Sequence, residues 1–164
     1  MKQLFLVRGL PGCGKSTFVR HEWKGSTSGL VAEHLEADKF FTFNKEGEYK
    51  FNKEMLPTAH AWCLGETHRS LSNNKVTVVS NTFSQLWELE PYIEAANLHG
   101  VALNIIDLYD NGWNDEDLCE RCVHNVPLAV ICEMRNRWEL FSLNSTVLHW
   151  GGYMRPHYTL TLKE

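Results

Sequence analysis

The stretch "GLPGCGKST", residues 9–17, fits the spacing G-x-x-x-x-G-K-[ST] of a loop that holds phosphate groups. The apolar run at 4–7 in front of it predicts a buried strand, and residues 15–23 predict a helix. Glycines permit backbone angles and close approaches that a side chain forbids, so successive N–H groups can point inward around an anion. The stretch therefore predicts a nucleotide-binding strand–loop–helix unit, and the alternative is a glycine turn that matches the spacing by chance.

The polar residues of this loop have separate expected tasks. Lys15 supplies a point charge for the β and γ phosphates, and Ser16 supplies a hydroxyl for Mg²⁺, so ATP and Mg²⁺ are the expected cofactors. The N-terminal end of the following helix carries a partial positive charge that favours the same phosphates. The residues expected to bind the nucleotide are Gly9, Gly12, Cys13, Gly14, Lys15, Ser16 and Thr17.

Length and composition set the class of protein. The chain has 164 residues, which predicts a single domain over residues 1–164. A formal charge of −4 excludes a global basic field, so any contact with nucleic acid needs a local patch. The five cysteines are an odd number, no signal-peptide pattern precedes the first strand, and no apolar run is long enough to span a membrane. These features predict a cytoplasmic protein with reduced cysteines.

Short β-rich runs alternate with longer helical patterns along the chain. Strands are expected at 3–8, 32–37, 75–80 and 101–108, and helices at 15–23, 52–72, 84–98, 115–123 and 127–141. An alternating run at 158–162 predicts a terminal strand on a sheet edge. This order predicts an α/β protein with the P-loop NTPase fold, in which a parallel sheet has helices on both faces and ligands bind at the carboxyl ends of the strands.

Residues beyond the loop separate the classes of P-loop protein. The sequence has no N-K-x-D segment, which a GTPase would need, and the expected third strand ends in "SNTF" rather than in the acidic pair of a motor ATPase. Asp38, in "LEADKF", follows the second expected strand, which we expect to lie beside the phosphate loop. Its carboxylate suits a general base that accepts a proton from a hydroxyl. Asp38 as a helix N-cap is an equally good interpretation of the residues alone.

Five blocks in this order resemble the P-loop kinases of the polynucleotide kinase type, over residues 1–140. They are "GLPGCGKST", "EADKF", "YKFNKEMLPTAHAWC", "VVSNTFSQLWELEPYIEAA" and "ERCVHNVPLAVICEMRNRWE". The group includes phage kinases that act on modified DNA. The resemblance implies that Lys15 and Ser16 bind ATP and Mg²⁺ and that Asp38 is the general base. Asn81 stands where the end-healing enzymes of the group have an acceptor-binding aspartate, so the acceptor hydroxyl would be held differently here.

The resemblance also implies a small helical lid at residues 112–127. Arg121 would stabilise the transferring phosphoryl group, as a third catalytic residue beside Lys15 and Asp38. Arg135 is expected on a solvated helix face, paired with Glu133 and Glu139. The residues expected to contact the acceptor are His60, Asn81, Thr82, His124 and Arg137.

The expected function is ATP-dependent phosphorylation of a polynucleotide hydroxyl. Two acceptors fit: the hydroxymethyl group of 5-hydroxymethyluracil in phage DNA, and the 5′-OH of a strand end. DNA is therefore the expected partner, with no membrane and no protein partner, in the cytoplasm of a phage-infected host. The alternatives are a small-molecule kinase acting on a nucleoside or sugar, and a non-catalytic regulatory module that binds ATP.

Overall fold

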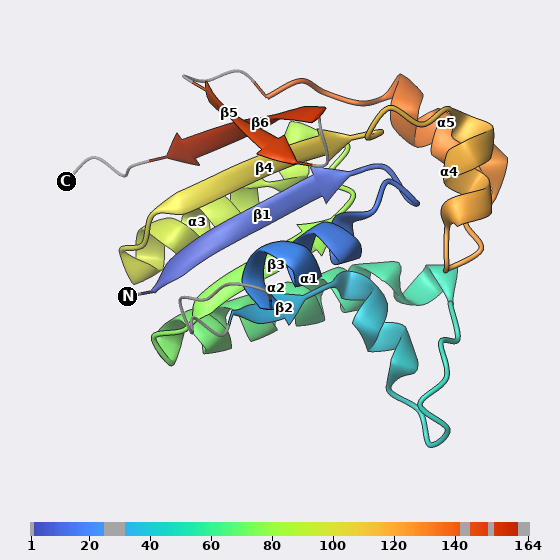
Figure 1. Cartoon of the computed structure of the whole chain (residues 1–164). Helices are drawn as coiled ribbons and strands as arrows, with labels where there is room; N and C mark the ends of the chain where they lie inside the picture. Colours follow the sequence, from blue (N-terminus) through green and yellow to red (C-terminus); the bar gives the residue numbers. More distant parts are fainter. Residues whose placement is uncertain (1, 25–31, 142–144, 151–152, 161–164) are drawn as a thin grey trace.

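The structure is a computed structural model in which residues 2–24, 32–141, 145–150 and 153–160 are described. Its sheet has the strand order β2-β3-β1-β4-β6-β5 (Figure 1). The first four strands in this order pair in parallel, and β6 and β5 are antiparallel additions beyond β4. The strands are β1 Gln3–Gly9, β2 Glu33–Leu35, β3 Val76–Asn81, β4 Leu103–Tyr109, β5 Ser145–Trp150 and β6 Tyr153–Leu160.

Five α-helices and three short 3-10 helices in the described part of the chain connect and cover the strands. The α-helices are α1 Lys15–Lys24, α2 Leu56–Ser72, α3 Glu90–His99, α4 Asp115–Arg121 and α5 Leu128–Asn136. The 3-10 helices are η1 Ala37–Thr42, η2 Lys53–Met55 and η3 Leu86–Glu88. Each described helix is too short or too polar to cross a bilayer.

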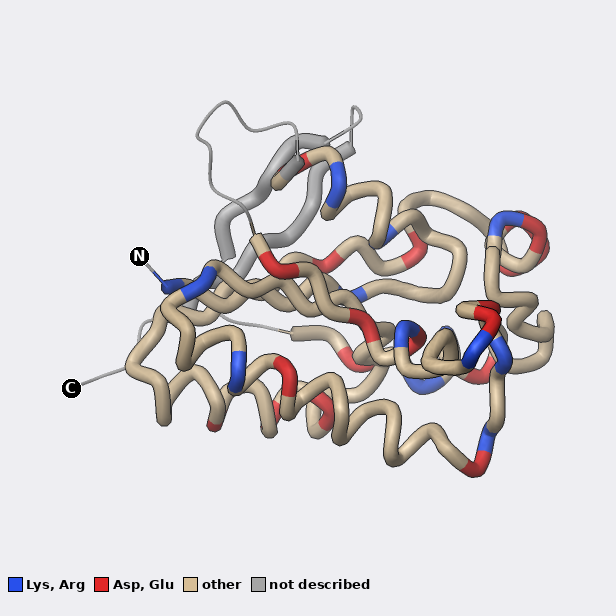
Figure 2. Tube along the Cα trace, turned by 90° about the horizontal axis from the view of Figure 1, so that it is seen from below, with Lys and Arg blue, Asp and Glu red and all other residues tan. Residues whose placement is uncertain are grey.

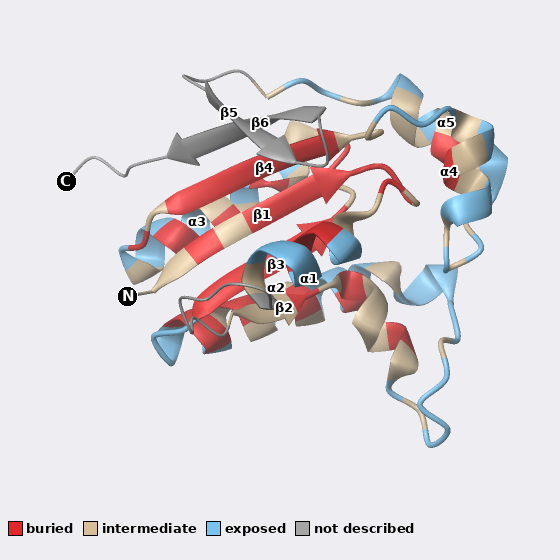
Figure 3. Ribbon diagram, in the orientation of Figure 1, coloured by how far each residue is buried: buried red, intermediate tan, exposed pale blue. Residues whose placement is uncertain are grey.

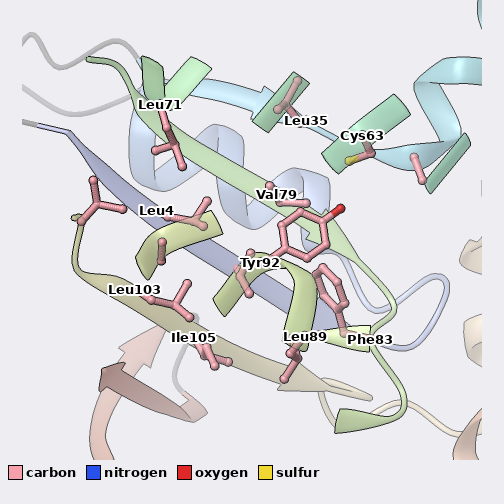
Figure 4. Close-up of a cluster of buried hydrophobic side chains, with 14 of the residues drawn as sticks. Leu4, Leu35, Cys63, Leu71, Val79, Phe83, Leu89, Tyr92, Leu103 and Ile105 are labelled. Carbon is pink, nitrogen blue, oxygen red and sulfur yellow. The ribbon is translucent and has the colours of Figure 1, made fainter. Parts of the chain in front are cut away.

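Side chains that point alternately to the two faces of the sheet form a separate apolar core on each face. Leu4 and Leu6 of β1 pack with α2 and α3, as does Val79 of β3 (Figure 4). The neighbouring residues Val7 and Val78 point to the other face, where they pack with α1, α4 and α5. Successive strand residues point to opposite faces, so two buried strands can serve both layers. β1, β3 and β4 are accordingly buried along most of their length (Figure 3).

The expected α/β fold is confirmed, and its element boundaries differ in informative ways. The second strand ends at Leu35, because the chain turns into η1 at Ala37. It pairs with β3 and not with β1, so β3 separates β2 from the strand that leads into the phosphate loop. The long helix expected from residue 52 begins at Leu56, after η2, whose N-cap Asn52 accepts a hydrogen bond from the backbone N–H of Glu54. The last helix ends at Asn136 rather than at 141.

The expected terminal strand is longer than its alternating pattern and has a partner. β6 covers Tyr153–Leu160, and residues 161–162 of the expected strand lie outside the described residues. β6 pairs with β4 on one side and with β5 on the other. The chain therefore extends its parallel sheet with an antiparallel pair at the β4 edge.

Arg135 holds α5, α4 and the end of β4 together. Its guanidinium lies 2.6 Å from a carboxylate oxygen of Asp110 and 2.6 Å from one of Asp115, and it donates to the Trp113 carbonyl at 3.0 Å. The expected pairing with Glu133 and Glu139 was wrong, because the Arg135 side chain turns inward to two carboxylates of the preceding segment.

Replacing Arg135 by alanine should lower the free energy of unfolding at pH 7 by about 1–3 kcal/mol, since two half-buried carboxylates lose their partner. The hydrogen bond from Arg135 lowers the pKa of Asp115. A carboxyl whose pKa is lowered by folding stabilises the protein above its unfolded pKa of about 3.9, and the stabilisation is lost as the pH falls below that value. Denaturant titrations should therefore show the difference between the two proteins shrinking toward pH 3. Arg69→Ala, which removes an exposed helix pair with Glu66, should leave the stability nearly unchanged.

Candidate active site

The loop between β1 and α1 depends on two glycines with positive φ. Gly12 has φ +80° and Gly14 has φ +97°. A Cβ on Gly12 would lie 2.1 Å from the carbonyl oxygen of Leu118 in α4, whereas a Cβ on Gly14 would meet nothing within 4 Å. Gly12 thus permits the close approach of α4 to the loop, and Gly14 shapes the open side of the loop.

Gly12→Ala should destabilise the protein by about 1–3 kcal/mol, because the added methyl group collides with backbone at a strained φ. It should also weaken ATP binding about 10-fold, because α4 is displaced from the loop. Thermal unfolding and ATP titration measure the two effects. Gly65→Ala is the matched control: Gly65 lies in α2, where a Cβ would meet nothing within 4 Å, and a helical Gly→Ala change should add about 0.5–1 kcal/mol of stability.

Lys15 and the first turn of α1 line the open side of the loop. The Lys15 ammonium donates to the carbonyls of Gly9 at 2.8 Å and Leu10 at 3.2 Å. The first helical hydrogen bond runs from the Phe18 N–H to the Gly14 carbonyl at 2.9 Å, so the N–H groups of residues 15–17 precede it. An ammonium group, helix-terminal amides and glycines with positive φ are the donors that a polyphosphate requires. These residues fit the triphosphate of a nucleotide.

The Cys13 side chain lies under the loop. It is fully buried, and a Cβ built on Gly9 would meet its Sγ at 2.5 Å. Its backbone N–H donates to the Leu10 carbonyl at 3.2 Å and its carbonyl accepts from the Asn111 amide at 3.1 Å, so Cys13 supports the shape of the loop from below.

Ser16 donates a hydrogen bond to a carboxylate that sequence analysis missed. The acceptor is Glu36, which follows β2, and the Ser80 hydroxyl donates to the same oxygen at 2.9 Å. His34 completes the group, with its Nε2 atom 3.3 Å from this oxygen. Burial raises the pKa of the Glu36 carboxyl, but the hydrogen bonds from His34, Ser16 and Ser80 outweigh burial and lower the pKa to about 2. The ionised carboxylate fixes the direction of the Ser16 hydroxyl.

Asp38 lies in the first turn of η1, two residues beyond Glu36. The N-cap position of η1 is occupied by Glu36, so the interpretation of Asp38 as a helix N-cap was wrong. The Asp38 carboxylate instead accepts a hydrogen bond from the Tyr49 hydroxyl at 3.2 Å, and its second oxygen lies 3.7 Å from Nε2 of His124. Its side chain is 47% exposed, so the carboxylate is open to solvent.

Residues 112–127, which we call the α4 segment, bring a cation to the phosphate loop. α4 and α5 lie beyond the carboxyl ends of β1 and β4 (Figure 1). Nε of Arg121 donates to the Gly12 carbonyl at 3.2 Å, and its guanidinium lies 4.3 Å from the ring centroid of Trp113. The loop that follows α4 places His124 against Asp38. One short segment therefore touches both the phosphate loop and the carboxylate of η1.

The remaining residues expected at the acceptor make other contacts. The Asn81 side-chain oxygen accepts from the Ala37 N–H at 2.9 Å, and its amide nitrogen lies 3.8 Å from the Cys63 sulfur, so Asn81 anchors η1 to β3. The Thr82 carbonyl accepts from the Gly9 N–H at 3.2 Å. Within the described residues, His60 is exposed on α2 and Arg137 donates to the Ser84 hydroxyl at 2.9 Å, and neither contacts Asp38 or the loop.

Arg8, the last residue but one of β1, connects the site to the chain beyond α5. Its side chain is fully buried, with one nitrogen 3.5 Å from Asp107 and another donating to the Glu139 carbonyl at 2.8 Å. Its guanidinium also lies 4.1 Å from the ring centroid of Trp138. Burial raises the pKa of Asp107, with Arg8 opposing it. These contacts hold the end of β1 in place at the centre of the sheet, and the phosphate loop begins at this end.

Comparisons with known proteins agree with this geometry. The sequence model of the family described as AAA domain matches residues 4–138. NEDD4-binding protein 2 of Homo sapiens is 29% identical over 141 residues, which is 84% of this chain and 8% of that protein. The chain thus spans a small part of the length of this relative.

Two solved structures show the same fold. A chain of the Pnkp1/Rnl/Hen1 RNA repair complex has a TM-score of 0.61 and 18% identity, over 83% of this chain and 43% of that chain. A gluconokinase from Sinorhizobium meliloti 1021 has a TM-score of 0.50 and 19% identity, over 84% of this chain and 75% of that chain. The two neighbours differ in their substrates, so the shared fold leaves the acceptor open.

Proposed function

The chain belongs to the AAA domain family, a P-loop kinase-like family, and from this premise we propose that it transfers the γ-phosphate of ATP to a hydroxyl of a polynucleotide. The acceptor is either the hydroxymethyl group of 5-hydroxymethyluracil in phage DNA, met in the cytoplasm of the infected host, or a 5′-OH end. One observation carries the proposal: the α4 segment places Arg121 on the phosphate loop and His124 beside the exposed Asp38 carboxylate. In this proposal the phosphate loop is the donor site and Asp38 is the proton acceptor, and the α4 segment contacts both.

Each residue of the site has a separate role in the proposed reaction. Lys15 and Arg121 bind the phosphates and stabilise the charge that develops on the transferring group. Ser16, oriented by Glu36, is the residue that would hold Mg²⁺, which when bound neutralises charge on the β and γ oxygens. Asp38 orients the acceptor hydroxyl and takes its proton as the new O–P bond forms. The α4 segment acts as a lid that keeps water from the phosphates.

Exposed aromatic side chains that pack around η1, the helix that carries Asp38, favour a polynucleotide acceptor. Phe43 is 62% exposed and packs edge-on against Trp62, with 4.9 Å between ring centroids. Phe51, 53% exposed, packs against Phe41 of η1. Exposed aromatic rings stack on nucleobases irrespective of sequence. The fold likeness to a chain of an RNA repair complex and the block resemblance to polynucleotide kinases support the same acceptor class.

A small-molecule acceptor is the second candidate, and the charge distribution favours it. The formal charge is −4, and basic and acidic residues are interspersed along the described chain rather than gathered in a basic stripe (Figure 2). A nucleic-acid surface normally shows such a stripe. The fold likeness to a gluconokinase fits this candidate as well.

Transfer of labelled γ-phosphate to three matched DNA oligonucleotides tests the proposal. The first has a free 5′-OH, the second has a blocked end and an internal 5-hydroxymethyluracil, and the third is blocked and unmodified. Label in the first or second, with the third blank, supports a polynucleotide kinase and identifies its acceptor. Label in none of them, with transfer to a nucleoside or to gluconate in parallel reactions, would replace the polynucleotide by a small molecule.

A further inference from the structure

Tyr49, in the connection between η1 and η2, contacts both Asp38 and His124. Its hydroxyl donates to Oδ1 of Asp38 at 3.2 Å. Its ring stacks on the His124 ring, with 4.3 Å between centroids and 30° between planes. The connection that follows η1 and the distant loop that follows α4 therefore meet at one carboxylate.

The two oxygens of the Asp38 carboxylate have different surroundings. Oδ1 receives the Tyr49 hydrogen bond, while Oδ2 lies 3.7 Å from His124 Nε2, which is beyond hydrogen-bonding distance. Burial, followed by the charge of Asp38, raises the pKa of the Tyr49 phenol, so the hydroxyl keeps its proton and remains a donor. One oxygen is thus held, and the other can accept a hydrogen bond from a substrate.

Tyr49 is itself held by its neighbours. Its ring packs edge-on against the buried Phe41, with 5.9 Å between centroids, and the Lys50 N–H donates to the Phe41 carbonyl at 3.0 Å. Phe41 belongs to η1, the same helix as Asp38. The connection therefore folds back onto η1 and carries the Tyr49 hydroxyl to Asp38.

The ring contact with His124 links Tyr49 to the α4 segment, which also contacts the phosphate loop. His124 lies three positions after Arg121, which donates to the Gly12 carbonyl. A closed α4 segment consequently makes contact with the phosphate loop through Arg121 and with Tyr49 through His124. Opening the segment would break both contacts together.

We propose that Tyr49 is a positioning residue for the reaction: its hydroxyl orients Asp38 so that Oδ2 faces the acceptor, and its ring holds His124 and the closed α4 segment. The inference rests on the proposed function. In the transfer step the acceptor O–H bond breaks, and its proton moves to Oδ2 of Asp38. The acceptor oxygen forms a bond to the γ phosphorus while the bond from that phosphorus to the ADP oxygen breaks. Tyr49 keeps its proton throughout.

Tyr49→Phe separates the hydroxyl from the ring. We expect kcat to fall about 10-fold, because a misoriented base loses part of its catalytic advantage, while KM for ATP stays the same. The acceptors are the oligonucleotides with a free 5′-OH and with 5-hydroxymethyluracil. Tyr109→Phe is the matched control, since it also removes one phenol hydrogen bond, to Arg135 at 3.2 Å, away from Asp38. Equal kcat values for Tyr49→Phe and the wild type would overturn the inference.

A double-mutant cycle shows whether Tyr49 acts through Asp38. In an Asp38→Asn background, Tyr49→Phe should have no further effect on kcat, because the carboxylate that it orients is already gone. A further 10-fold loss, additive to that of Asp38→Asn, would show that Tyr49 acts by another route and would contradict the inference. If Asp38→Asn alone leaves transfer intact, the proposed function fails instead, so the two failures are distinguishable.

Hydrogen exchange tests the ring contact without any acceptor. Tyr49→Leu removes the stack, and amide exchange at residues 122–126 should then become faster, whereas Tyr49→Phe keeps the ring and should leave exchange as in the wild type. Unchanged exchange in Tyr49→Leu would show that the ring does not hold the α4 segment. This result would overturn that half of the inference even if none of the oligonucleotides accepts phosphate.

Discussion

Lys15→Ala should lower kcat/KM for phosphoryl transfer by about 10³-fold, equivalent to about 4 kcal/mol of transition-state stabilisation. The Lys15 ammonium sits on the phosphate loop, bonded to the carbonyls of Gly9 and Leu10, within reach of any phosphate that the loop holds. Removing it takes away the charge nearest to the developing negative charge. Steady-state transfer of labelled phosphate to the accepting oligonucleotide measures the loss.

Lys50→Ala is the control for charge removal, because Lys50 is 58% exposed and pairs with Glu46 on the surface. Its activity should lie within about twofold of the wild type, as expected for a surface pair of little energetic consequence. If Lys15→Ala kept wild-type transfer, the loop would not be the donor site, and the proposed function would fall with it.

Asp38→Asn should reduce kcat by about 10³-fold, because an amide of nearly the same shape cannot take the acceptor proton. Affinity for ATP, measured by titration calorimetry, should stay within about twofold, since Asp38 makes no described contact with the phosphate loop. Binding and transfer are thus separated by one side chain. Loss of transfer with retained affinity for ATP is the result expected for a general base that contacts the acceptor and not the nucleotide.

The matched control for this change is Glu48→Gln, which neutralises an exposed carboxylate in the neighbouring connection. It should leave transfer unaltered. Full activity in Asp38→Asn, together with normal ATP binding, would favour a regulatory module in which bound ATP only changes contacts with a partner.

Local features of the site were accessible from the sequence because their determinants are contiguous. The phosphate loop is built by residues 9–17, and the loop glycines, Lys15 and Ser16 all lie in the expected strand–loop–helix unit. The four parallel strands could be predicted for the same reason, because each is formed by a contiguous apolar run. The β5 strand was missed because its pairing partner β6, rather than its own pattern, makes it a strand.

Contacts between distant segments were not accessible in this way. Ser16 and Glu36 are separated by a whole helix and strand, and no local pattern indicates that they share a hydrogen bond. The available signal in the sequence was that Glu36 and Asp38 both lie at the end of the second expected strand. A role was predicted for Asp38 alone. Tyr49 depends on the folding of an aromatic and polar connection with no periodicity, so its place beside Asp38 emerges only in three dimensions.

Asn81 illustrates how tertiary contacts change the interpretation of a motif residue. The resemblance implied that its amide binds the acceptor, but both ends of the amide already lie against Ala37 and Cys63. A buried amide with protein partners at both ends stabilises its surroundings. Asn81 thus supports η1 through Ala37, and its contact with an acceptor stays a prediction.

Phosphorus NMR of a single reaction shows whether the γ-phosphate of ATP reaches a polynucleotide hydroxyl. Wild-type protein is mixed with MgATP and with oligonucleotides that carry a free 5′-OH or a 5-hydroxymethyluracil, and the products are followed with time. We expect ADP and a new phosphate monoester to appear in equal amounts, with no matching rise in inorganic phosphate. Formation of ADP with inorganic phosphate alone, or persistence of ATP that is nevertheless bound, would contradict transfer to a polynucleotide.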